Sequence, residues 1–82
     1  MALSNVIVLR GGPSSEHEVS LMSGETMIRE LPKNKYNPID IVIDRSGNWT
    51  LENKPTTPER VLRHADVVLN AMHGEYGEDG GV

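Results

Sequence analysis

The 82-residue sequence contains no cysteine and no phenylalanine, and its only large aromatic residues are one tryptophan and two tyrosines. The absence of cysteine excludes a disulfide framework and a thiolate metal site, which support many very small domains. The hydrophobic core must therefore be aliphatic, and it will be small, because a chain of this length buries only about 60–65% of its unfolded surface. We expect one domain of marginal stability that depends on further structure.

A strong excess of charge and a long apolar run are also missing. The net charge is −4, and the basic residues are scattered singly among acidic ones, unlike the surfaces that bind nucleic acid or anionic membranes. The first apolar run stops at Arg10, which is too early for a signal-peptide core or a membrane span. The sequence predicts a cytoplasmic protein that acts on small polar molecules, without a nucleic-acid or membrane partner.

Three apolar, β-branched runs predict the main strands, and they cover residues 5–9, 39–43 and 66–72. Continuous runs of this kind are typical of strands buried on both faces, as in a parallel sheet. Trp49 and Leu51 alternate with polar residues after a turn, and they predict one more short strand. Residues 55–58 are expected to form a linker.

The segment after the first run predicts a helix that ends at Pro32. Ser15 and Glu18 have the spacing of a capping box, so we expect the helix to start at Ser15. One apolar stripe follows the helical period, and its expected members are Leu21, Gly24, Ile28 and Leu31. Glycine weakens a helix, so close packing against the sheet is the expected reason for Gly24.

A second, brief helix is predicted from Glu59 to His64, with Thr57 as its N-cap and Pro58 at its first position. The order strand, helix, strand, helix, strand indicates an α/β fold, a three-layer Rossmann-like parallel sheet with flanking helices. Val82 falls inside what should be the next helix, and a parallel sheet with an open edge exposes unpaired groups. We therefore expect a truncated domain.

Two glycine-rich segments follow predicted strands, at residues 11–20 and 73–81. Sites in such sheets lie beyond the carboxyl ends of the strands, so both segments are expected to face one crevice. A helix N-terminus suits an anion such as phosphate or carboxylate. The first segment lacks the glycine spacing of dinucleotide folds and the Gly-Lys-Ser/Thr of the P-loop, so a tight turn with ordinary capping is the alternative.

Three side chains in these segments are candidates for chemistry. Glu18 is explained as the capping-box partner, which leaves Glu16 to face the crevice and to bind a substrate ammonium. His73 follows a strand end, where an imidazole can orient a carboxylate or move a proton, or simply cap the strand. The three histidines lie on separate elements, so no metal site is expected within this chain.

The two segments resemble the N-terminal signatures of a known family. GGPSSEHEVSLMSG at 11–24 and NAMHGEYGEDGGV at 70–82 are similar to those of the D-alanine–D-alanine ligases, members of the ATP-grasp superfamily. The turn and tryptophan of residues 44–49 resemble the same family. The resemblance covers essentially the whole chain, and it implies that residues 1–82 are an incomplete N-terminal substrate-binding domain of the pre-ATP-grasp type, without the ATP-grasp domains.

In that family, ATP phosphorylates the carboxylate of one D-alanine, and the amine of a second attacks the acyl phosphate to give the dipeptide of peptidoglycan. The resemblance implies that Glu16 holds the ammonium of the first D-alanine and that His73 lies beside the same substrate. Gly74 is expected to let the backbone approach the ligand. Ser20 belongs to the matched pattern and is expected to support the first loop at the substrate site.

The resemblance further implies ATP and Mg²⁺ or Mn²⁺ as cofactors, bound by regions outside this chain, and a homodimer for the full-length enzyme. The partners are D-alanine and the remaining ATP-grasp domains, and the chain alone is expected to be inactive. Two alternatives stay open: a stand-alone module that binds amino acids or partner proteins without catalysis, and a fragment of a D-alanine–D-lactate or D-alanine–D-serine ligase.

Overall fold

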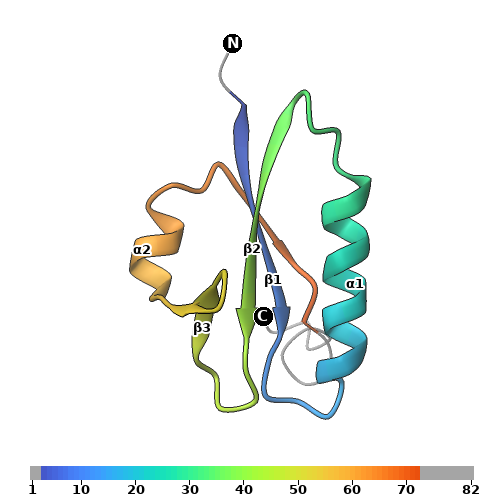
Figure 1. Ribbon diagram of the computed structural model, residues 1–82, viewed down its shortest axis with the longest axis vertical. Coiled ribbons are helices and arrows are strands. Elements are labelled where there is room, and N and C mark those ends of the chain that lie inside the picture. Colours follow the sequence, from blue (N-terminus) through green and yellow to red (C-terminus); the bar gives the residue numbers. More distant parts are fainter. Residues whose placement is uncertain (1–2, 73–82) are drawn as a thin grey trace, which may run out of the picture.

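The computed structural model describes residues 3–72, which form one five-stranded sheet and two helices. The helices α1 and α2 lie on opposite sides of the sheet (Figure 1), which makes three layers. The predicted α/β architecture is confirmed. In chain order the elements are β1 (Ser4–Gly11), α1 (His17–Glu30), β2 (Tyr36–Ile43), β3 (Trp49–Leu51), β4 (Lys54–Pro55), α2 (Pro58–Leu62) and β5 (Val67–Asn70).

The strand order is β4-β3-β2-β1-β5, so β1 lies between its two parallel neighbours β2 and β5. Ile7 of β1 is paired with Ile39 on one side and with Val68 on the other. The three predicted main strands are confirmed. The carboxyl ends of β1, β2 and β5 consequently meet at one edge of the sheet, where the sequence placed its glycine-rich segments.

The side of the sheet beyond β2 is antiparallel, because β3 pairs with β2 and β4 pairs with β3 in opposite directions. Glu52 and Asn53 both have positive φ angles, 53° and 69°, as a tight two-residue hairpin turn requires. The short strand predicted at Trp49 and Leu51 is confirmed. The prediction of a linker from residue 55 was wrong in part, since Pro55 belongs to β4, an edge strand where a missing N–H is tolerated.

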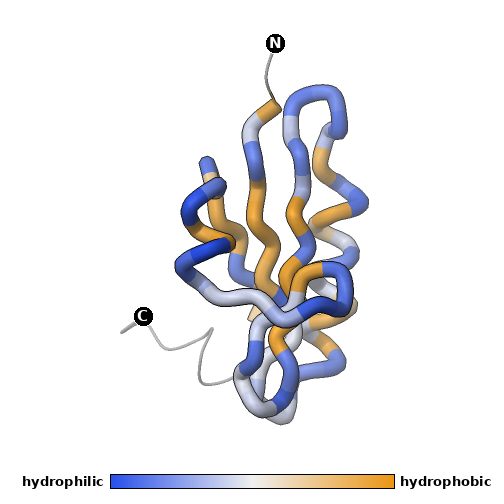
Figure 2. The backbone as a smooth tube through the Cα atoms, turned by 60° about the vertical axis from the view of Figure 1, so that its left-hand side comes forward, coloured by the Kyte–Doolittle hydropathy of each residue, from blue (hydrophilic) through white to orange (hydrophobic). Residues whose placement is uncertain are grey.

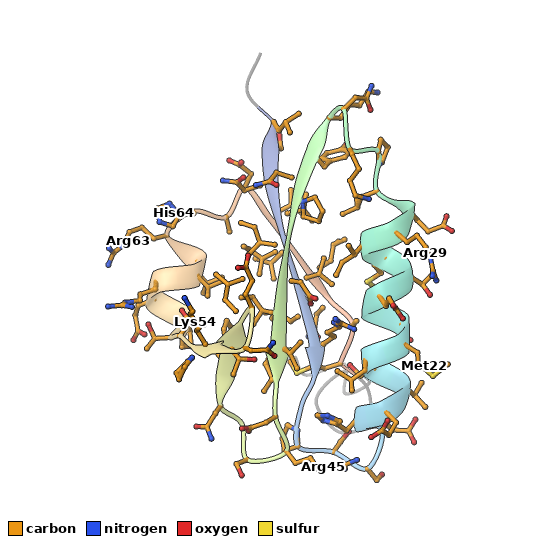
Figure 3. The ribbon with its side chains drawn as sticks, in the orientation of Figure 1. Met22, Arg29, Arg45, Lys54, Arg63 and His64 are labelled. Carbon is orange, nitrogen blue, oxygen red and sulfur yellow. The ribbon has the colours of Figure 1, made fainter. Side chains whose placement is uncertain are left out.

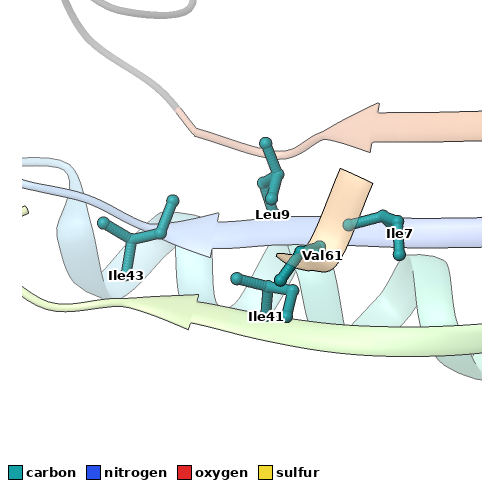
Figure 4. Packing of buried hydrophobic residues seen from close by; sticks show 5 residues of the cluster. All are labelled: Ile7, Leu9, Ile41, Ile43 and Val61. Atoms are coloured by element: carbon teal, nitrogen blue, oxygen red, sulfur yellow. The ribbon is translucent and has the colours of Figure 1, made fainter. Parts of the chain in front are cut away.

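The hydrophobic core is aliphatic and divided by the sheet. Figure 2 shows the apolar residues concentrated in the strands and the hydrophilic ones in the turns. Alternate residues of a strand face opposite sides. On one side of the sheet, five buried residues form a cluster, to which α2 contributes Val61 (Figure 4). Its members are Ile7, Leu9, Ile41, Ile43 and Val61. Val6 and Val8, also buried, occupy the alternate positions of β1, which face α1.

The helix α1 packs closely on β1 through Gly24. A Cβ atom at Gly24 would lie 2.6 Å from the Cβ of Arg10, so only glycine fits without movement. The Arg10 guanidinium donates hydrogen bonds to both carboxylate oxygens of Asp40, at 2.8 and 2.7 Å, and one to the Leu21 carbonyl at 2.9 Å. The hydrogen bonding to Asp40 raises the pKa of Arg10. The bond to the Leu21 carbonyl holds the Arg10 side chain against the helix. The predicted role of Gly24 is confirmed.

Replacing Gly24 with alanine is expected to lower the free energy of unfolding by up to about 2 kcal/mol. The overpacking cost of about 1–3 kcal/mol exceeds the gain of about 1 kcal/mol in helix propensity. Urea unfolding, followed by the fluorescence of Trp49, measures the change. Met22→Ala, at an exposed position of the same helix, is the control and is expected to be near neutral. A stabilised Gly24→Ala variant would show that α1 does not press on Arg10.

The helix α2 begins as the sequence predicted. The Thr57 side chain accepts a hydrogen bond from the Arg60 N–H, and Pro58 occupies the first helical position.

Within residues 3–72, the structure contains no helix that is long and apolar enough to span a membrane.

Candidate substrate-binding site

The candidate site lies at the carboxyl ends of β1, β2 and β5. Residues 12–16 connect β1 to α1, residues 44–48 connect β2 to β3, and Ala71 and Met72 follow β5. Backbone hydrogen bonds tie these segments together: the Gly12 N–H donates to the Ile43 carbonyl at 2.7 Å, and the Ala71 N–H donates to the Leu9 carbonyl at 2.8 Å. The crevice predicted between the two glycine-rich segments stays a prediction, because the second segment lies outside the residues that the structure describes.

Two glycines fix the path of the chain from β1 to α1. Gly11 and Gly12 have φ angles of 96° and 95°, which side chains rarely allow. A Cβ on Gly11 would lie 2.3 Å from the Ile43 carbonyl oxygen, and one on Gly12 would lie 3.0 Å from the Met72 sulfur. The loop therefore fits tightly between the ends of β2 and β5.

Ser20 joins the end of β1 to the segment after β5 from the helix side. Its hydroxyl is completely buried, accepts a hydrogen bond from the Gly11 N–H at 2.8 Å and donates one to the Ala71 carbonyl at 2.8 Å. These contacts support the loop that follows β1 and the segment that follows β5. A contact between Ser20 and substrate stays a prediction.

Glu16 is the last residue before α1, and its backbone is held on both sides. Its N–H donates to the Ser14 hydroxyl at 3.1 Å, and its carbonyl accepts from the Ser20 N–H at 2.9 Å. The side chain is exposed, and its carboxylate makes no hydrogen bond or ion pair with any residue of the described part of the chain. Glu16 thus presents an unpaired negative charge from a fixed backbone.

The predicted capping box was wrong. The helix begins at His17, and its N-cap residue is Glu16, whose side chain makes no capping hydrogen bond. Glu18 instead approaches Arg45, with 3.5 Å between its Oε2 and the Arg45 Nη2. Figure 3 shows Arg45 at the end of the sheet where α1 begins. Both side chains are exposed, so this ion pair contributes little to stability.

The buried side of α1 also differs from the predicted stripe. Its buried residues are His17, Ser20 and Gly24, whereas Leu21, Ile28 and Leu31 are only partly buried. His17, Ser20 and Gly24 are themselves spaced by three and four residues. This helical spacing is the signal from which the burial of His17 could have been predicted. The His17 Nδ1–H donates to the Gly12 carbonyl at 2.7 Å, so this residue belongs to the site.

The turn after β2 completes the same edge. The Asp44 carboxylate accepts hydrogen bonds from the backbone N–H groups of Asn48 and Ser46, both at 2.9 Å. Hydrogen bonding from Asn48 and its neighbours holds the pKa of Asp44 below its ordinary value. This turn is therefore well ordered by its own side chain and brings Arg45 to the start of α1.

His73 and Gly74 lie outside the residues that the structure describes, so their predicted roles stay predictions. Within residues 3–72, no group of three or more histidine, cysteine, aspartate or glutamate residues is placed to hold a metal ion. The geometry of the described part is that of a fixed loop with one free carboxylate, which is suited to bind a cationic group.

Comparisons with known proteins identify the family that the chain resembles. Residues 5–64 match the family model described as D-ala D-ala ligase N-terminus. A D-alanine–D-alanine ligase of Finegoldia magna is 34% identical and one of Bacillus anthracis is 44% identical, over 93% and 92% of this chain. The chain spans only 28% and 22% of the length of these relatives.

Solved structures show the same likeness. The VanG D-Ala:D-Ser ligase from Enterococcus faecalis matches with a TM-score of 0.77 and 26% identity, over 96% of this chain and 32% of that one. The D-alanine–D-alanine ligase from Bacillus anthracis matches with a TM-score of 0.60 and 37% identity, over 94% and 22%. The family match, the relatives and the shared fold together show that this chain belongs to the D-alanine–D-alanine ligase family, in the part described by the family's N-terminal model.

Proposed function

We propose that this chain is the substrate-binding front part of a ligase that joins two D-alanine molecules into D-alanyl-D-alanine for peptidoglycan. Family membership supports the reaction class. Because the chain spans about a quarter of the length of its relatives, the activity belongs to the whole protein, and the 82 residues alone are inactive. The remaining ATP-grasp domains supply the rest of the catalytic machinery.

The observation that carries this proposal is the unpaired carboxylate of Glu16. Its backbone is fixed by Ser14 and Ser20, and its side chain has no partner among residues 3–72. A positive helix end stabilises a carboxylate and disfavours an ammonium, so a glutamate at this point makes the binding of an amino acid's ammonium favourable. Glu16 therefore binds the ammonium of the first D-alanine.

The other site residues act around this contact. His73 lies beside the first D-alanine and helps to place it, and the Gly74 backbone approaches the same substrate. Ser20 holds the loop after β1 and the segment after β5 in place through its hydrogen bonds to Gly11 and Ala71.

The chemistry consists of two transfers. The carboxylate of the first D-alanine attacks the γ-phosphorus of ATP, which gives an acyl phosphate and ADP. The amine of the second D-alanine attacks the acyl carbon, loses a proton and expels phosphate. Mg²⁺ or Mn²⁺, held by regions outside this chain, neutralises phosphate charge when bound.

The proposed enzyme is cytoplasmic and homodimeric. One alternative has a specific observation in its favour, since the VanG structure that resembles this chain is named a D-Ala:D-Ser ligase. Both reactions use D-alanine as the first substrate, so the role of Glu16 is the same in either. Product analysis with mixed D-alanine and D-serine, or D-lactate, distinguishes them. The other alternative, a module that binds amino acids or partner proteins without catalysis, requires that the chain alone fold cooperatively and bind a ligand.

Glu16→Gln tests the proposal in a full-length ligase that carries this chain as its N-terminal part. Neutralising the carboxylate removes a charge-assisted contact of about 1.5–3 kcal/mol, which corresponds to a KM for the first D-alanine about 10–150 times higher. Phosphate release at saturating ATP, measured against the D-alanine concentration, gives this value.

Glu18→Gln is the matched control, because it makes the same chemical change two residues away at an exposed position. We expect its KM for the first D-alanine to stay within about a factor of two, since the lost ion pair is exposed and weak. If the two variants behaved alike, Glu16 would not be the ammonium ligand. If Glu18→Gln were the more damaging, the two carboxylates would have exchanged roles.

A further inference from the structure

His17 is a polar side chain that the proposed chemistry does not use, although it is only 8% exposed. Its ring lies against Gly11, the last residue of β1, and against Gly12. The His17 Cε1 is 3.1 Å from the position that a Cβ of Gly11 would occupy, and the Nδ1 is 2.7 Å from the Gly12 carbonyl oxygen. A carbonyl only accepts hydrogen bonds, so Nδ1 carries the proton and Nε2 does not need one.

This hydrogen bond closes the loop between β1 and α1. Ser20 holds the Gly11 N–H from one position of the helix, and His17 holds the Gly12 carbonyl from another. At the helix end of the loop, the His17 N–H donates to the Ser14 carbonyl at 3.2 Å. The side chain and the backbone of His17 therefore fix both ends of the segment that contains Glu16.

We propose that His17 is a positioning residue for Glu16, an inference that rests on the proposed function of this site. Glu16 and His17 share a peptide bond. When the imidazole is locked to Gly12, the direction in which the Glu16 Cα presents its carboxylate is locked as well. His17 acts through Glu16 and does not touch the substrate. Without the lock, the loop samples orientations in which the carboxylate misses the ammonium, which weakens binding of the first D-alanine.

The test compares His17→Leu with His17→Asn in the full-length ligase. Leucine fills the space but has no hydrogen-bond donor. We expect it to raise the KM for the first D-alanine about tenfold, because the hydrogen bond that orients the loop is lost. The kcat and the KM for the second D-alanine are expected to change by less than about twofold. Asparagine places an N–H₂ donor close to the position of Nδ1, so His17→Asn is expected to recover most of the loss.

A second measurement does not depend on activity. The ¹⁵N chemical shifts of the His17 ring in the wild-type protein report which nitrogen carries a proton, and we expect a proton on Nδ1. A proton on Nε2 alone would overturn the proposal, because the hydrogen bond to Gly12 would then not exist. This experiment remains decisive if a substituted protein does not fold.

The kinetic outcomes separate this inference from the proposed function. If Glu16→Gln raises the KM for the first D-alanine and His17→Leu does not, the site is correct and the positioning role is wrong. The positioning role is also wrong if His17→Asn does not restore the KM for the first D-alanine. The same holds if His17→Leu raises the KM values of both D-alanine molecules equally. If the wild-type enzyme does not use D-alanine, the proposed function fails, and the ring tautomer still tests the lock.

Discussion

The Gly11→Ala variant is expected to lose about 2–6 kcal/mol of unfolding free energy, enough to unfold a marginal domain. Two costs add at this position. The φ angle of 96° is unfavourable for alanine, and the new Cβ would lie 2.3 Å from the Ile43 carbonyl oxygen. That oxygen is held by a hydrogen bond from the Gly12 N–H, so it moves only if β2 and the loop separate. Urea unfolding at 25 °C, followed by the single tryptophan, measures the loss.

Gly47→Ala is the matched control for this prediction. Gly47 has a φ angle of 91°, yet no atom lies within 4 Å of the position of its Cβ. Alanine therefore adds only the backbone cost there, about 1–3 kcal/mol. The gain from a less flexible unfolded chain is the same in both variants and cancels in the comparison. Equal losses for the two variants would show that Gly11 is required for its φ angle and not for its fit against β2.

Ser20→Ala is the second change with a large expected effect, a loss of about 2–4 kcal/mol. It leaves two buried backbone groups, the Gly11 N–H and the Ala71 carbonyl, without their hydrogen-bond partner. The hydroxyl is completely buried, so water cannot replace it without opening the structure. We also expect the Gly11 amide to exchange its hydrogen faster than in the wild type, which NMR or mass spectrometry measures.

Thr26→Ala removes a hydroxyl from the same helix at an exposed position, where the Oγ1 donates to the Met22 carbonyl. It is expected to change stability by less than about 0.5 kcal/mol. If Ser20→Ala were equally mild, the hydroxyl would not be joining β1 to the segment after β5. A large loss of stability with unchanged exchange at Gly11 would place the effect elsewhere in the core.

Much of the architecture could be predicted because it depends on local patterns. The β-branched runs identified β1, β2 and β5, and the threonine and proline before α2 identified its first turn. Gly24 could be interpreted because a glycine inside a helix has few reasons other than close packing. In each case the signal and the structure that it predicts lie within a few residues of one another.

Most of what the sequence did not predict is decided by residues that are distant in the chain. The capping box had the correct spacing, but α1 begins at His17, and Ser15 lies in the turn before it. Ser20 has its acceptor 51 residues away at Ala71, and no periodicity announces such a bond. Glu16 could be singled out by its place at the strand–helix junction. The hydrogen bond from His17 goes to the backbone carbonyl of Gly12, and every residue type has such a carbonyl, so the sequence does not indicate this partner.

The position of β1 between β2 and β5 has a consequence for the order of folding. Pairing of β1 with β2 closes a shorter loop than pairing of β1 with β5, where Asn5 meets Asp66 across 61 residues. Closing the longer loop costs more entropy, so the second pairing is expected to form later. The Ser20 bridge to Ala71 and the packing of Gly12 against Met72 then form last, and a ligand that binds only the folded site is expected to stabilise it further.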